Sequence, residues 1–248
     1  MAECAGMSRT AFANAFREYE EVLKYKDNEL YDIALFKSAW CLWRMDRPED
    51  AAKRFLAVFK ATAEGSGKKS GKDELQTEAL KNLVAVFVED EKNRAEDMHR
   101  FLVKAGGEKF AGRIVRALAE GLYDQSHYER GIEAYRLLLK LEPMSPDAYK
   151  YGLAIAQGHS TMETWGKLQD DYRWLLKEYV PPEPKSKQKA SAWVKAHNAA
   201  TVAAAAAAIE KQLRDDAVGL HAKAQRDKTS KGEYSGAIGL YEVYLTRY

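Results

Sequence analysis

The chain has 248 residues, 46% of them hydrophobic and 31% charged, and 39 basic against 37 acidic side chains leave a formal net charge of +2. With 16 glycines and 6 prolines, it has too few turn-forming residues for an all-β sandwich or barrel. The near-neutral charge argues against nucleic acid as the main partner. Abundant Ala, Leu, Glu and Lys favour long helices instead.

Apolar residues recur at steps of three and four along most of the chain, which is the period of an amphipathic helix. Charged residues, Gly and Pro separate these stretches, and the longest interruption is the Gly- and Lys-rich segment 63–72. No segment alternates strictly between polar and apolar residues, so the sequence predicts about eleven helices and no sheet. They cover approximately residues 8–25, 29–45, 48–62, 75–89, 93–105, 109–123, 128–141, 145–157, 161–179, 189–227 and 233–245.

A Pro- and Lys-rich stretch, 181–188, is the clearest linker in the chain. It predicts a division into helical repeats over 1–180 and a second part over 189–248. The second part begins with one long helix over about 189–227, roughly 58 Å at 1.5 Å per residue. A final half-repeat follows that helix.

Two cysteines, Cys4 and Cys41, are too few for a disulfide framework or a structural zinc site, although a single bridge stays open. Only Met1-Ala2-Glu3 precede Cys4 and form no apolar stretch, so we expect no signal peptide in this chain. The most apolar segment, 202–209, is far shorter than the roughly 20 residues that a transmembrane helix needs. No membrane span is therefore expected.

One short pattern occurs four times: a small residue, an aromatic residue four positions later and an apolar or aromatic residue three beyond that. The copies are Ala15-Tyr19-Val22, Ala51-Phe55-Val58, Gly131-Tyr135-Leu138 and Ala237-Tyr241-Tyr244. The third copy reaches Pro143, five residues past Leu138. This pattern resembles the second helix of the tetratricopeptide repeat (TPR) family, in which a terminal Pro follows at that offset.

The resemblance implies a right-handed α–α superhelix, a TPR-like solenoid that continues through the linker. Its anchors at positions 15, 51, 131 and 237 lie 36, 80 and 106 residues apart, against a family period of about 34. The longer intervals hold two divergent helix pairs, 75–105 and 147–179, and the long helix. Because the chain opens on the second helix of a repeat and closes just before a terminal Pro, we expect it to be a piece of a longer protein.

Known catalytic patterns are missing from the sequence. The five histidines are scattered without a metal-ligand spacing, and we expect each at the surface or in a turn. The segment 65–72 fails as a phosphate-binding loop because Ser66 stands where the first Gly belongs and Asp73 follows Lys72. We therefore predict no enzyme, with no catalytic residue, metal site, cofactor or small-molecule substrate.

A binding surface is a better-supported hypothesis. Phe36, Trp40, Trp43 and Arg44 lie on one predicted helix, and Trp and Arg are the residue types that anchor interfaces. The TPR resemblance implies that this face lines a concave groove that holds a partner peptide. The alternative, that either Trp packs against the next helix pair, is equally open. The corresponding face of helix 109–123 carries Arg113, Arg116, Glu120 and Tyr123.

These features predict a non-catalytic scaffold or adaptor that binds protein or peptide partners within a multiprotein assembly. One alternative is a structural subunit, a homo-oligomer that self-associates through the Ala-rich stretch 199–209. Another is a helical-repeat RNA-binding protein that uses the Lys-rich loop 63–72 and the linker, where a basic cluster surrounds Trp193. That cluster consists of Lys185, Lys187, Lys189 and Lys195.

The stretch 40–51, with Trp, Arg and Pro at its turn, is similar to large TPR proteins of δ-proteobacterial (myxobacterial) cell envelopes, including those of gliding and secretion assemblies. This similarity implies a location in the bacterial periplasm or envelope, with the cytoplasm as the alternative.

Overall fold

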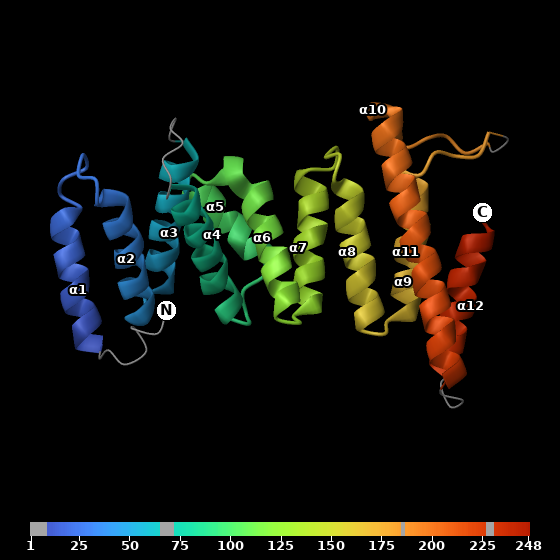
Figure 1. The fold of residues 1–248 in the computed structure, drawn as a ribbon, viewed down its shortest axis with the longest axis horizontal. Coiled ribbons are helices and arrows are strands. Elements are labelled where there is room, and N and C mark those ends of the chain that lie inside the picture. Colours follow the sequence, from blue (N-terminus) through green and yellow to red (C-terminus); the bar gives the residue numbers. More distant parts are fainter. Residues whose placement is uncertain (1–8, 65–71, 185–186, 227–230) are drawn as a thin grey trace. The chain divides into compact units, whose positions relative to one another are not determined.

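Helices dominate the structure, a computed structural model that describes residues 9–64, 72–184, 187–226 and 231–248. Within these ranges the chain has twelve α-helices and no β-strand, which confirms the prediction of an all-α fold (Figure 1). The helices are α1 (Arg9–Val22), α2 (Tyr31–Arg44), α3 (Pro48–Glu64), α4 (Lys72–Glu89), α5 (Ala95–Lys104), α6 (Ala111–Asp124), α7 (Tyr128–Leu141), α8 (Ala148–Thr161), α9 (Trp165–Tyr179), α10 (Ala192–Ala196), α11 (Ala199–Arg226) and α12 (Lys231–Leu245).

The chain divides into two units, Met1–Gly121 and Leu122–Tyr248, with the boundary inside α6. In the first unit, α1 packs on α2, α2 packs on α3, and α3 packs on α4. In the second unit, α7 packs on α8, α8 packs on α9, and α9, α11 and α12 pack on one another. Packing between sequence neighbours is the arrangement of a helical-repeat fold. The predicted linker 181–188 lies inside the second unit.

The small residue of the repeated pattern is buried in three of its four copies, and the aromatic residue is buried in two of them. In α3, Ala51, Phe55 and Val58 are completely buried, because a small residue lets the neighbouring helix approach and the aromatic ring fills the space beside it. In α12, Ala237 is buried, whereas Tyr241 is only partly covered. The pattern therefore marks helix contacts in both units.

Four helices end in the same hydrogen-bonded turn, which the sequence pattern did not reveal. After α2, α5, α6 and α8 one residue adopts a left-handed conformation, with φ between 55° and 66°. The next backbone N–H donates to a carbonyl five residues earlier, a Schellman termination. The left-handed residues are Asp46, Gly106, Ser126 and Glu163. The residues whose carbonyls accept are Leu42, Leu102, Leu122 and His159, all of them buried.

Ser126 offers a test of this turn. A left-handed conformation costs a residue with a Cβ atom roughly 1 kcal/mol relative to Gly. The Ser126→Gly variant should therefore raise the free energy of unfolding by about 0.5–1 kcal/mol, since the added freedom of the unfolded chain offsets part of the gain. Chemical denaturation followed by circular dichroism would measure the change. Gln125→Gly, one residue earlier, should instead destabilise the chain, and equal effects of the two would argue against the assigned turn.

The predicted single helix over 189–227 is wrong, because the chain breaks at His197 and Asn198. His197 has an extended backbone (φ −107°, ψ 154°), and the Asn198 side chain accepts from the Thr201 N–H at 2.8 Å and so caps α11. Trp193 anchors the preceding α10: its side chain is buried and its indole N–H donates to the Ser145 carbonyl at 2.8 Å. The long helix near the C-terminal end is therefore α11, with 28 residues.

The turn predicted at 158–160 is also displaced. Gly158, His159 and Ser160 are helical, and α8 continues to Thr161 before the chain turns at Glu163. Gly158 is there for close packing, because a Cβ atom on it would lie 2.3 Å from the Tyr123 hydroxyl oxygen. A glycine in a helix interior can thus mark a close contact and not a turn.

Among the described residues, no helix is both long and apolar enough to cross a membrane. Cys41 is buried, whereas Cys4 lies outside the described ranges. Most of the Gly- and Lys-rich segment, residues 65–71, also lies outside them.

Candidate functional site

An aromatic cluster in the first unit contains three of the predicted binding residues. Phe36, Trp40 and Trp43 project from α2 toward the buried ring of Phe55 on α3. The ring centroids of Phe36, Trp40 and Trp43 lie 5.5, 6.3 and 6.3 Å from that of Phe55, in edge-on arrangements that aromatic pairs favour. The two tryptophan rings are 5.0 Å apart. Steps of four and three residues place all three on one face of α2.

Both tryptophans also line an open groove of about 520 Å³, which we call the tryptophan groove. The groove lies where the end of α2, the turn into α3 and the end of α4 meet. Its lining consists of Trp40, Trp43, Arg44, Asp46, Pro48, Val86, Glu89 and Asp90. Since Trp40 and Trp43 are only partly buried, each ring both packs on Phe55 and borders the groove. Both rings thus pack on a neighbouring helix, whereas the binding of a partner peptide by this face stays a prediction.

Polar contacts hold the rings in place. The Trp43 indole N–H donates to a Glu89 carboxylate oxygen at 2.6 Å, which ties α2 to the end of α4. The Arg44 guanidinium lies over the Trp40 ring, 5.7 Å from its centroid, at the distance of a cation–π contact. Three carboxylates and one guanidinium line this groove, so its formal charge is negative.

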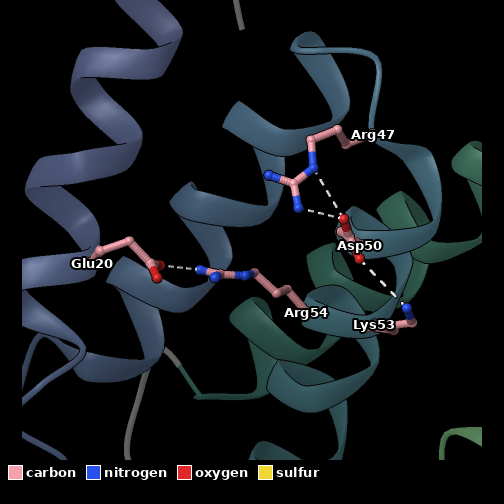
Figure 2. A network of polar contacts seen from close by, with 5 residues as sticks. All are labelled: Glu20, Arg47, Asp50, Lys53 and Arg54. Atoms are coloured by element: carbon pink, nitrogen blue, oxygen red, sulfur yellow. Dashed lines mark hydrogen bonds and ion pairs between the residues drawn. The ribbon is translucent and has the colours of Figure 1, made fainter.

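Polar contacts also join α3 to α1 and α2, and Figure 2 shows the contact with Glu20 of α1 and those around Asp50. Arg54 of α3 donates to Glu20 of α1 and to the buried Ser38 hydroxyl of α2, each at 2.6 Å. At the start of α3, Asp50 accepts from Arg47 and Lys53. The hydrogen bond from Arg47 is the main reason why the pKa of Asp50 lies below its usual value. Arg54 therefore links α2, the helix that carries both tryptophans, to α1 and α3.

The Arg54→Ala variant should lower the free energy of unfolding by about 2 kcal/mol. It leaves the Ser38 hydroxyl without this donor and removes the guanidinium packed over Phe16, 4.9 Å from the ring centroid. Thermal unfolding measures the effect. Arg47→Ala, which removes a more exposed arginine from the residue just before α3, should cost less than about 1 kcal/mol. Equal losses would contradict the assignment of Arg54 as the link.

The other predicted binding residues lie elsewhere. Arg113 of α6 packs over the Phe59 ring at 5.0 Å and donates to the Gln76 side chain at 3.0 Å, so it stabilises contacts inside the first unit. Arg116 is partly buried and Glu120 is exposed. None of these three residues lines the tryptophan groove.

Tyr123 belongs to the second unit. Its hydroxyl donates to the Ala154 carbonyl at 2.8 Å, and its ring meets those of Tyr128 and Tyr135, both at 5.2 Å. Burial, reinforced by nearby Tyr135 and Asp171, raises the pKa of its hydroxyl. The structure thus gives Tyr123 a packing role between helices of the second unit.

A wider groove, which the sequence did not predict, lies beside the tryptophan groove. It has a volume of about 1070 Å³ and is bordered by the start of α3, the end of α4 and α5. Phe87 and Phe101, 5.3 Å apart, lie on its wall. Pro48, Val86 and Asp90 line both grooves, so the two form a continuous surface. Phe87 and Phe101 could have pointed to this groove, because each is a large aromatic residue in a predicted helix. Both are half-buried, and each is followed by a buried residue.

His159 contradicts the prediction that every histidine lies at the surface or in a turn. It is 2% exposed, and its Nδ1 atom lies 2.5 Å from an Asp171 carboxylate oxygen. Burial is the largest influence on the pKa of Asp171 and raises it, while His159 lowers it. A second internal pair links the Tyr172 hydroxyl to Asp216, whose pKa is raised by burial. None of these residues lines either groove, so both pairs contribute to the core of the second unit.

No protein-family model matches the chain, and no curated protein matches it at a significant level.

Proposed function

We propose that the protein is a non-catalytic scaffold of the TPR type that binds a segment of a partner protein in the tryptophan groove. The observation that carries the proposal is the pair of partly exposed tryptophans, held by Glu89 and by Phe55 in a groove with a negative rim. Rigid aromatic anchors beside a continuous, partly apolar surface are typical of protein-binding sites.

The charges in the groove favour a partner segment with a lysine or arginine side chain. Asp46, Glu89 and Asp90 line the groove against a single cation, Arg44. Arg44 already lies over the Trp40 ring, so the groove accepts a cation against an indole face. A cationic side chain from the partner would gain the same contact with Trp43 and a charge-assisted hydrogen bond to Glu89.

The wider groove supports binding of an extended segment. It continues from the tryptophan groove past Phe87 and Phe101, and apolar residues such as Ala52 and Val103 border it as well. A cationic residue seated beside Trp43 would leave the following residues of the partner near Phe87 and Phe101. We therefore propose a partner motif in which apolar residues accompany the lysine or arginine.

The structure argues against RNA binding at the basic cluster, because Trp193, the aromatic residue of that cluster, is not accessible. Trp193 is 1% exposed and its ring stacks on His197, with the centroids 4.2 Å apart, so no face is open to a nucleic-acid base. Lys187, Lys189 and Lys195 are exposed, whereas Lys185 lies outside the described residues. A protein partner is the better-supported choice.

An envelope location agrees with this proposal and would be tested by fractionating cells that express the full-length protein.

A peptide display library screened against the full chain tests the proposal. We expect enrichment of peptides with Lys or Arg next to apolar residues, and binding that weakens as salt rises. The Glu89→Gln variant keeps an oxygen acceptor for Trp43 but removes the charge, so it should weaken these peptides about tenfold. Asp73→Asn, at an exposed position at the start of the same helix, is the matched control. Enrichment of acidic peptides, or equal binding to the Glu89→Gln variant, would refute the charge assignment.

A further inference from the structure

The outer face of α12 carries a stripe of apolar side chains with coiled-coil spacing. Its residues, which we call the α12 seam, are Tyr234, Ile238, Tyr241, Leu245 and Tyr248. The steps between them are four, three, four and three residues, which is the alternation of a heptad repeat. The helical hydrogen bonds continue past Leu245, with the Tyr248 N–H donating to the Tyr244 carbonyl at 2.9 Å. All five residues thus lie along one side of the helix.

The seam is exposed although it is apolar. Tyr234, Ile238, Leu245 and Tyr248 are 38%, 57%, 75% and 51% exposed. The opposite side of α12 packs into the core of the second unit through Ala237, Leu240 and Val243. The helix therefore has apolar residues on both sides, and a helix of that kind is normally buried on both sides.

Residues of the neighbouring helix α11 lie next to the seam. The rest of α11 exposes several charged side chains, in contrast to α12. His221 of α11 lies 3.2 Å from the Tyr241 hydroxyl, and Val218, one turn earlier, is 52% exposed. Elsewhere, α11 exposes charged residues such as Lys211 and Arg214. In α12 only Lys231, Glu233 and Glu242 are charged, and Glu233 pairs with Lys223 at 3.4 Å.

We propose that the α12 seam is a homodimer interface, in which the α12 seam of a second copy packs against it. An apolar stripe with heptad spacing is complementary to a copy of itself, because side chains from one helix fill the spaces between those of the other. In a two-fold arrangement centred near Tyr241, Tyr234 at one end of the stripe meets Tyr248 at the other end of its copy. Ser235 and Glu242 flank the stripe and stay in water.

The exposed area is sufficient for a dimer. With roughly 150–250 Å² for a large apolar side chain, the exposed parts of the seam and Val218 come to on the order of 500 Å² per copy. Two copies would bury about 1,000 Å², which is the lower limit for a specific interface. A patch of this size is also at the upper end of what monomeric proteins expose. The seam shares no residue with the tryptophan groove, so this inference does not rest on the proposed function.

Sedimentation velocity of the full chain over a wide range of concentrations tests this inference. The wild-type chain should sediment as a dimer that dissociates on dilution. Leu245→Glu and Ile238→Glu should each weaken self-association at least about tenfold, since a carboxylate would be buried in the interface. Both positions are exposed in the single chain, so circular dichroism should show an unchanged fold. Ser235→Glu, an exposed position beside the seam, should leave the dimer intact.

Each other outcome overturns the inference. A wild-type chain that stays monomeric at the highest concentration has no such interface. Loss of the dimer in an Ala203→Glu, Ala207→Glu variant but not in the seam variants would assign self-association to the Ala-rich face of α11. Assembly without a size limit would contradict a closed two-fold pair.

Discussion

Replacing Trp40 and Trp43 together by alanine should weaken binding of a partner peptide by about a hundredfold or more. Central tryptophans of an interface often contribute 2 kcal/mol or more each, and both rings border the same groove. Isothermal titration of a peptide enriched by the library screen would measure the loss. Since the rings also pack on Phe55, we expect a drop of about 2–4 kcal/mol in the free energy of unfolding as well.

Two controls separate lost binding from lost folding. Trp43→Phe keeps an aromatic ring on Phe55 but removes the indole N–H that Glu89 accepts from, so it should retain the fold and lose part of the affinity. Trp174→Ala removes a partly exposed tryptophan of the second unit and should leave affinity unchanged. If the double variant is folded and binds as tightly as the wild type, the groove is not the binding site.

Replacing Trp193 by alanine should destabilise the second unit by about 4 kcal/mol, the largest effect that we expect on stability. Removing a buried tryptophan side chain typically costs about 3–5 kcal/mol because a cavity remains. Trp193 also donates a hydrogen bond to Ser145 and contacts the rings of Tyr179 and His197, so the Ser145 carbonyl would lose one of its two donors as well. Guanidinium denaturation followed by circular dichroism would report the change.

Trp174→Ala is the matched comparison for stability as well, since it removes the same side chain from a position that is 37% exposed. We expect it to cost less than half as much as Trp193→Ala. A loss of under about 1 kcal/mol for Trp193→Ala would mean that α10 is not anchored by this side chain.

The fold class followed from the sequence because helical periodicity and scarce Gly and Pro are strong local signals. The errors arose where a long-range contact overrides a local pattern. The segment 189–227 reads as one helix, but the burial of Trp193 against Ser145 and the cap at Asn198 divide it. Gly158 has the residue type of a turn, but it lies inside α8. A glycine is needed there because the Tyr123 hydroxyl approaches its backbone closely. Helix propensity is a local property, so it predicts neither the contact of Trp193 with Ser145 nor that of Gly158 with Tyr123.

The candidate site was predicted in part. Trp40, Trp43 and Arg44 were identified because their residue types and spacing are local properties of α2. Glu89 and Asp90, which complete the groove, lie about 45 residues away, and only the packing of α4 brings them to α2. The burial of His159 becomes understandable only once the structure has shown the four left-handed turns. This histidine occupies the position that Leu42, Leu102 and Leu122 hold in the other three, so its burial follows from the turn.

Hydrogen exchange of the full chain, with and without a saturating basic peptide, tests the central claim most directly. Bound peptide should slow exchange in the second half of α2, in the turn around Asp46 and at the end of α4, because these segments line the tryptophan groove. The Glu89→Gln variant should show less protection at the same peptide concentration. Protection confined to other helices, or no protection at a concentration that saturates binding, would contradict the account.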